Sequence, residues 1–189
     1  EARRTALAEA LRAALAADAA VRPVAPSRTV LLCHDPADRD IADLLVSYLQ
    51  RRGHAVWIDR SALGTKDGWR GRLLDVVWSS DGALFLVSPA SAASERAQRE
   101  VHLAGAERLP VLPVLAGPTD LDPALAWYVT QHEPIDLRSG PMAGLAALAV
   151  AVEALPARRV ARPRRAAIGV LVAAAVVTAL VLGVQALLG

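Results

Sequence analysis

The sequence predicts an α/β fold: a flavodoxin-like, doubly wound sheet of five parallel strands in the order 2-1-3-4-5, plus one C-terminal transmembrane helix. From Arg28 onward, short apolar runs alternate with helical stretches, which is typical of successive βαβ units. The run 83–87 is apolar on both faces, as expected of a central parallel strand covered by helices on each side. The segment Ala166–Gly189 contains no charged residue and is long enough to cross a hydrocarbon core of about 30 Å.

Composition narrows the class of protein. Hydrophobic residues make up 54% of the 189 positions, and the excess lies in the C-terminal segment. The net charge is +2, but five arginines fall within 158–165, so the rest of the chain carries no basic face that would suggest nucleic acid. Cys33 is the one cysteine, which excludes an internal disulfide and favours a reducing compartment. The first residue is Glu rather than Met, so a fragment or a processed chain is expected.

Residues 1–27 are expected to form an Ala-rich helix and a linker. Leu7, Leu11 and Leu15 are spaced four apart within 1–21, which produces a narrow apolar stripe on a helix. The prolines at 23 and 26 then favour a linker. We expect the helix to pack on the following domain or to join it to an upstream module.

The first half of the domain contains two expected strands and two expected helices. Strands are predicted at Thr29–Cys33 and 54–58. The helix predicted at 38–52 has apolar residues at helical spacing, and Gly53 is its stop. A second helix is predicted at 68–79, again from the spacing of its apolar residues.

The second half begins with the central strand at 83–87. Pro89 cannot continue the ladder, so a small-residue loop is expected from Ser88 to Ser94. Ser94 is the expected N-cap of a helix over 94–107, with Glu95 favoured in its first turn by the helix dipole. The remaining strands are predicted at 111–115 and 134–137, and the remaining helices at 123–130 and 144–155.

The predicted strand order places the candidate ligand site. In the order 2-1-3-4-5, the switch point lies between the first and third strands, at their carboxyl ends. The loops 33–37 and 88–94 therefore face each other across one crevice. Glu100 lies near the mouth of that crevice.

The C-terminal part is expected to anchor the chain in a membrane. Residues 157–165 form a basic juxtamembrane linker, and the transmembrane helix occupies Ala166–Gly189. By the positive-inside rule, the arginines of the linker hold the N-terminal side in the cytoplasm. We expect a single-pass membrane protein with a cytoplasmic domain over 28–156.

Several motifs, in order, resemble the Toll/interleukin-1 receptor (TIR) domain of bacterial type. TVLLCHDPAD, at 29–38, is similar to the first box of the family, with Cys33-His34-Asp35 in place of its usual Ser-Tyr-Ser. GHAVWIDRSAL, at 53–63, is similar to the second box, and GTKDGW, at Gly64–Trp69, occupies the loop that the family uses for self-association. Residues 88–100 resemble the third motif, with Arg96 and Ala97 in place of its Trp-Cys pair.

The resemblance implies an activity and a site. In TIR domains that act on NAD, the last Glu of the third motif is catalytic, and by position this is Glu100. A carboxylate suits the chemistry, because cleavage of the bond to nicotinamide makes an oxocarbenium-like ribose that an anion stabilises. NAD is the expected substrate, with no cofactor and no metal. The expected substrate-binding residues are His34, Asp35, Asp59, Trp69 and Ser88.

The expected function is a membrane-anchored NAD glycohydrolase activated by clustering, with a role in antiphage defence or cell-suicide signalling implied by resemblance alone. The expected partners are NAD, the membrane through Ala166–Gly189, and further copies of the chain through the loop Gly64–Trp69. The alternative is a non-catalytic TIR adaptor that signals by self-assembly. A phosphoacceptor receiver domain is excluded because Val87-Ser88 replace the Asp that it needs after the third strand. The glycine patterns of nucleotide-binding folds are missing, and the histidines and cysteine have no metal-ligand spacing.

Overall fold

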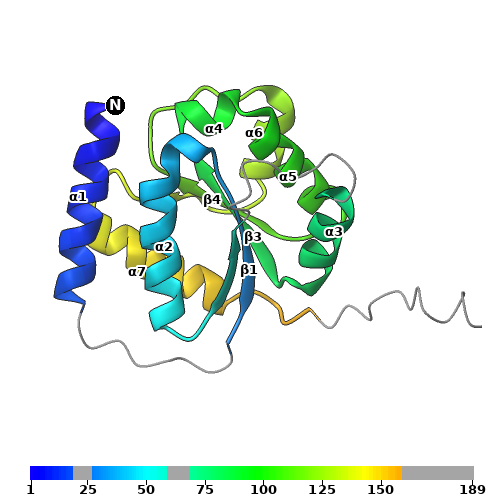
Figure 1. Cartoon of the computed structure of the whole chain (residues 1–189), viewed down its shortest axis with the longest axis horizontal. Helices are drawn as coiled ribbons and strands as arrows, with labels where there is room; N and C mark the ends of the chain where they lie inside the picture. Colours follow the sequence, from blue (N-terminus) through cyan, green and yellow to red (C-terminus); the bar gives the residue numbers. More distant parts are fainter. Residues whose placement is uncertain (19–26, 59–68, 159–189) are drawn as a thin grey trace, which may run out of the picture. The chain divides into compact units, whose positions relative to one another are not determined.

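The computed structural model describes residues 1–18, 27–58 and 69–158. Their centre is a parallel sheet of five strands in the order β2-β1-β3-β4-β5, as predicted (Figure 1). β1 pairs with both β2 and β3, which confirms the switch point between the first and third strands. The strands are β1 (Thr29–Cys33), β2 (Ala55–Ile58), β3 (Gly82–Val87), β4 (Val111–Leu115) and β5 (Ile135–Asp136).

Helices cover both faces of the sheet (Figure 1). Successive side chains of a strand point to opposite faces, so Val30 and Leu32 of β1 belong to one buried cluster, whereas Leu31 and Cys33 belong to the other. The first face packs against α1 (Ala2–Ala17), α2 (Arg39–Arg51) and α7 (Pro141–Glu153), and the second against α3 (Trp69–Ser79), α5 (Glu95–Ala106) and α6 (Pro123–Val129).

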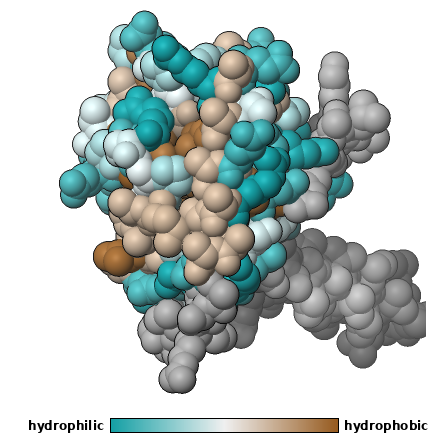
Figure 2. Space-filling model, turned by 90° about the vertical axis from the view of Figure 1, so that its left-hand side faces the viewer, coloured by the Kyte–Doolittle hydropathy of each residue, from teal (hydrophilic) through white to brown (hydrophobic). Residues whose placement is uncertain are grey.

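The N-terminal helix α1 is part of the packed domain. Its leucine stripe is buried against α2 and α7, and Leu11 is fully inaccessible to solvent. Figure 2, which faces this side of the molecule, shows apolar side chains gathered in one area with hydrophilic ones around it. Of the two expectations for this helix, packing on the domain is the one that the structure bears out. The linker predicted to follow it lies largely outside the described residues.

The predicted elements are found with small changes at their ends. Gly53 has a φ of 85°, a left-handed conformation that suits glycine and ends the preceding helix as predicted. The last helix begins at Pro141, three residues before the predicted start, because proline is well suited to the first turn of a helix. β5 is shorter than predicted at both ends.

One prediction between β3 and α5 is wrong. The segment expected to be a small-residue loop forms a short helix, α4 (Pro89–Ala93). Ser88 caps this helix by accepting a hydrogen bond from the backbone N–H of Ser91 at 3.0 Å, and Pro89 occupies its first turn. The Ser-Pro pair therefore ends a strand and begins a helix at once. Ser94 caps α5 as predicted, accepting from the N–H of Ala97.

The end of the described chain is tied to the amino edge of the sheet. The Arg28 side chain donates to the carbonyl of Leu155 at 2.8 Å, and the backbone N–H of Arg158 donates to the Asp81 carboxylate at 2.8 Å. Among the helices that the structure describes, none has the length and apolar character needed to cross a membrane. The predicted transmembrane helix at Ala166–Gly189 and most of the basic linker before it lie outside the described residues.

Candidate functional site

Two loops meet at the carboxyl edge of the sheet, where β1 and β3 lie side by side. The chain leaves β1 through a single turn of 3-10 helix, η1 (Pro36–Asp38), and leaves β3 directly into α4. A hydrogen bond from the Ser88 hydroxyl to the Asp38 carboxylate, 2.5 Å long, joins the two exits. This is the crevice that the strand order predicts. A buried ion pair lies on the α5 face of the sheet, and a carboxylate that accepts from a hydroxyl lies on the α1 face.

On the α5 side, Glu100 lies at the centre of the candidate site. Its side chain is buried, with 1% of the residue exposed, and Oε1 lies 3.2 Å from the Nε of Arg96, one helical turn earlier. Burying a carboxylate costs free energy unless it is paired with a cation and hydrogen-bonded. Among the described residues, Arg96 supplies such a cation. The position implied by the third motif is therefore occupied by a buried and ion-paired carboxylate.

Cys33 lies beside Glu100, at the end of β1. Burial raises the pKa of the Cys33 thiol well above its usual value, and the Glu100 carboxylate raises this pKa further through its charge and a hydrogen bond. The thiol therefore stays protonated at neutral pH. Glu100 thus pairs with Arg96 on its own helix, and its charge acts on Cys33 of β1.

His34 follows Cys33 and is also buried, with 3% of the residue exposed. Burial lowers the pKa of His34, the charges of Arg96 and Arg39 lower it further, and Asp43 and Asp35 act in the opposite direction. The imidazole is neutral at pH 7. Within the described part of the chain, its Nε2 atom has no hydrogen-bond partner. A buried ring nitrogen in this state can accept or donate one hydrogen bond to a ligand.

The other two described candidates have local structural roles. The Asp35 carboxylate accepts from the backbone N–H of Ala37 at 2.8 Å and caps η1. Ser88 caps α4 and donates to Asp38. Both side chains stabilise the ends of these loops.

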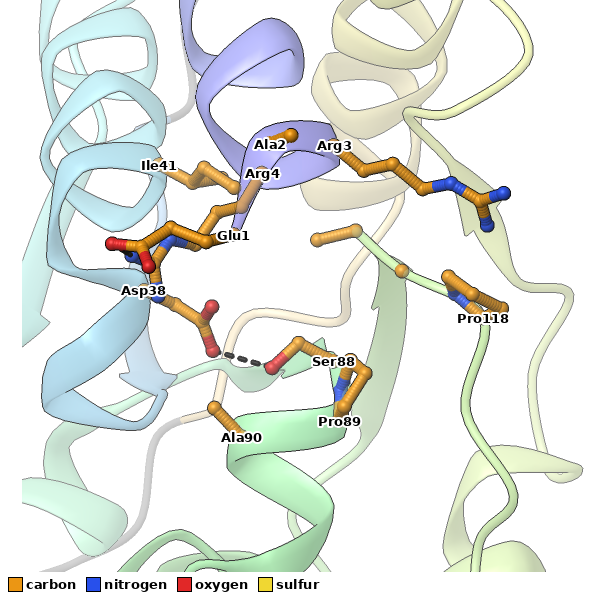
Figure 3. Close-up of a pocket in the computed structure, with 12 residues that line it drawn as sticks. Glu1, Ala2, Arg3, Arg4, Asp38, Ile41, Ser88, Pro89, Ala90 and Pro118 are labelled. Carbon is orange, nitrogen blue, oxygen red and sulfur yellow. Dashed lines mark hydrogen bonds and ion pairs between the residues drawn. The ribbon is translucent and has the colours of Figure 1, made fainter.

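Ser88 and Asp38 belong to a cavity of about 360 Å³ on the α1 side of the crevice. Figure 3 shows the two side chains directed toward one another below the N-terminal turn of α1. Burial raises the pKa of Asp38, and the hydrogen bond from Ser88 opposes this rise. The other lining residues are Glu1, Ala2, Arg3, Arg4, Ile41, Pro89, Ala90, Ala116, Gly117 and Pro118.

The remaining candidates, Asp59 and Trp69, come from the loop after β2. Asp59 lies outside the described residues, as does the loop predicted for self-association except for its last position. The backbone of Trp69 begins α3. The structure therefore buries His34 at the carboxyl end of β1 and places Ser88 in the cavity on the α1 side of the crevice.

Sequence reasoning did not assign three residues of this edge: Arg96, Cys33 and Asp38. The spacing of Arg96 and Glu100, four residues apart on one helix, is a signal that could have found the ion pair. Cys33 and Asp38 carried no such signal, because their partners come from distant positions in the chain.

The fold and these motifs agree with the family comparison. A family profile described as the TIR domain matches residues 30–149. Since this match covers more than half of the chain, the protein belongs to the TIR-domain family. No curated protein sequence gives a significant match to the chain.

Two solved structures match the chain. The first is the TIR domain of the Toll-related receptor TRR-2 from Hydra magnipapillata, with a TM-score of 0.55 and 16% identity over 66% of this chain and 97% of that one. The second is the TIR domains of the activated Roq1 resistosome, which directly recognizes the pathogen effector XopQ, with a TM-score of 0.39 and 19% identity over 68% of this chain and 85% of that one.

Proposed function

We propose that this TIR domain is an NAD glycohydrolase whose catalytic carboxylate is Glu100. The observation that carries the proposal is the buried Glu100 carboxylate beside Cys33, at the carboxyl end of β1. Open α/β folds bind their ligands at this edge. His34, which follows Cys33 in the chain, has an Nε2 without a partner among the described residues, and this atom supplies a polar group for a substrate hydroxyl or amide.

The chemistry needs one anion. As the bond between C1′ of the ribose and the nicotinamide nitrogen breaks, both electrons go to the nitrogen, and the pyridinium leaves as neutral nicotinamide. The positive charge moves to the ribose ring, where the Glu100 carboxylate stabilises it. Water then adds to C1′ and releases a proton to solvent. Burial strengthens the stabilisation, because an anion in a site of low dielectric interacts more strongly with a developing cation than it does in water.

The closed state of Glu100 supports activation by clustering. With 1% of the residue exposed, substrate reaches the carboxylate after the groups around it move. We propose that contacts between TIR domains produce this opening, that the loop at 64–69 takes part in them, and that Asp59 and Trp69 help to bind the substrate. We also propose that 166–189 anchors this bacterial-type domain to the cytoplasmic side of a membrane, where clustering would serve defence signalling.

The alternative, a non-catalytic TIR adaptor that acts by self-assembly, is favoured by the Arg96–Glu100 ion pair. A cation next to the carboxylate neutralises its charge, and such a pair can be purely structural. The two functions differ in whether NAD is consumed.

The test is NAD consumption by the full chain in liposomes at low and high surface density. We expect turnover that rises with density, and a loss of about 10²–10³-fold in Glu100→Gln, because one electrostatic contact to the transition state is removed. Glu95→Gln is the matched control, since Glu95 lies on the same helix with a side chain that is 88% exposed. Equal turnover by Glu100→Gln would remove Glu100 from this role. If the folded and clustered parent does not consume NAD, the glycohydrolase is ruled out and the non-catalytic adaptor is the remaining function.

A further inference from the structure

Arg96 is the solvent-accessible member of the ion pair with Glu100. The Arg96 side chain is 21% exposed, whereas the Glu100 side chain is 2% exposed. The two side chains lie on one face of α5 because they are four residues apart. A ligand that arrives from solvent therefore meets the guanidinium before it meets the carboxylate.

The charge of Arg96 also reaches the end of β1. After burial, Arg96 is the largest cause that lowers the pKa of His34, and it opposes the rise in the pKa of Cys33. The charge of Arg96 therefore acts on groups at the carboxyl end of β1 as well as on Glu100.

We propose that Arg96 binds the diphosphate of a dinucleotide substrate, and that this binding draws the guanidinium away from Glu100. The inference rests on the proposed function, because it assigns one part of the NAD molecule to one residue of the same site. A guanidinium fork matches phosphate oxygens and binds them through two parallel hydrogen bonds. Once Arg96 has exchanged partners, the charge of Glu100 acts on the ribose instead of on Arg96. Binding of the substrate thus frees the negative charge of Glu100 from Arg96, and this charge then favours cleavage of the same substrate.

The competing explanation is that Arg96 serves the fold alone. A buried carboxylate needs a cation, and the ion pair would then stay closed when ligand binds. The two explanations differ in what an anionic ligand does to the neighbours of Arg96. They also differ in whether the positive charge at position 96 affects ligand affinity.

The first experiment follows His34 by NMR in the full chain, labelled with ¹³C-histidine in detergent micelles. The chain has four histidines, and His34→Gln assigns the signal. We expect ADP-ribose, which carries the diphosphate, to shift the His34 signal saturably and to raise the pKa of His34, because the anion offsets the charge of Arg96. Arg39, Asp43 and Asp35 also act on this imidazole and remain in place. His54 accepts a hydrogen bond from Arg28 at the amino edge and should not respond.

Adenosine, which lacks phosphate, is the control ligand and should leave His34 unchanged. The absence of a saturable His34 shift up to about 10 mM ADP-ribose overturns the proposal, since such binding would be weaker than the millimolar range. An equal shift with adenosine overturns it as well. Because both results come from the parent chain, they do not depend on the folding of any variant.

The second experiment measures ADP-ribose affinity in three variants. Arg96→Gln should weaken binding about tenfold or more, because charge-assisted hydrogen bonds to the diphosphate are lost, and Arg96→Lys should lose less. Arg99→Gln is the matched control, since Arg99 forms an exposed pair with Glu95 on the same helix. Without ligand, the pKa of His34 should be higher in Arg96→Gln than in the parent. Unchanged affinity in folded Arg96→Gln overturns the proposal.

NAD consumption by the same samples separates this proposal from the proposed function. Binding through Arg96 without NAD cleavage would contradict the glycohydrolase and leave the anion site in place. Cleavage of NAD with the same KM in the parent and Arg96→Gln would support the glycohydrolase and overturn the role of Arg96.

Discussion

Two carboxylates are buried at the same edge of the sheet, and they are held in different ways. Glu100, on the α5 side, is 1% exposed and pairs with a cation at 3.2 Å. Asp38, on the α1 side, is 2% exposed and accepts a hydrogen bond from a neutral hydroxyl at 2.5 Å.

The partner decides what each carboxylate can do. The Ser88 hydroxyl also caps α4, so its hydrogen bond to Asp38 connects α4 to η1. This contact has a structural role. The Arg96 guanidinium is partly exposed and can exchange one anion for another. Equal burial thus accompanies a structural role on one side of the crevice and a proposed catalytic role on the other.

The largest expected effect on stability is at the ion pair. Arg96→Ala leaves Glu100 buried without this cation, and we expect a loss of about 2–4 kcal/mol in the free energy of unfolding. Arg99→Ala removes an exposed pair of the same spacing and should cost less than about 0.5 kcal/mol. Equilibrium urea unfolding of the full chain in matched detergent measures both. Equal losses in the two variants would mean that the burial of Glu100 does not matter to the pair.

A smaller effect on stability is expected at the hydrogen bond between Ser88 and Asp38. Ser88→Ala removes both the cap of α4 and the donor to Asp38, and we expect it to cost about 1.5–3 kcal/mol. Ser79→Ala is the control, because Ser79 is exposed and donates only to a carbonyl of its own helix among the described contacts. Its cost should stay within about 0.5 kcal/mol in the same unfolding measurement. An unchanged free energy of unfolding in Ser88→Ala would show that water replaces the hydroxyl in this cavity.

The smallest effect is a dependence on pH. Burial raises the pKa of Asp38 above its value in the unfolded chain, so the carboxyl contributes stability that is fully present below about pH 4 and is lost as pH rises through the raised pKa. Asp38→Asn cannot ionise and keeps an acceptor for Ser88. Its stability relative to the parent should therefore increase from pH 4 to pH 7 in urea unfolding. A constant difference across this range would mean that Asp38 ionises as freely in the folded chain as in the unfolded one.

Histidines oppose this trend in the parent and in Asp38→Asn alike. Burial lowers the pKa of His34 and of His54, so each contributes stability above about pH 6.5 that is lost as pH falls through its lowered pKa. The comparison of Asp38→Asn with the parent cancels these contributions and isolates the carboxyl.

The sequence by itself determined the strand order and most helix boundaries. Apolar runs, Gly53 and Ser94 act locally, through backbone conformation and capping, so their effects can be predicted without distant contacts. The same local chemistry encoded α4, where Ser88 and Pro89 form a helix start that was interpreted as a loop. The position of Glu100 on the third motif was also available from the sequence.

Only the tertiary structure decided which side chains surround that position. Cys33 and Glu100 lie 67 positions apart in the printed numbering, and Asp38 and Ser88 lie 50 apart. The crossover connections of a parallel sheet bring such residues together at one edge, and no local pattern records the pairing. The physical reason is that the burial of a side chain and the identity of its partners are fixed only when the helices pack on the sheet. The chain thus specified a carboxylate near the carboxyl edge, and packing placed Cys33 beside that carboxylate and Asp38 beside Ser88.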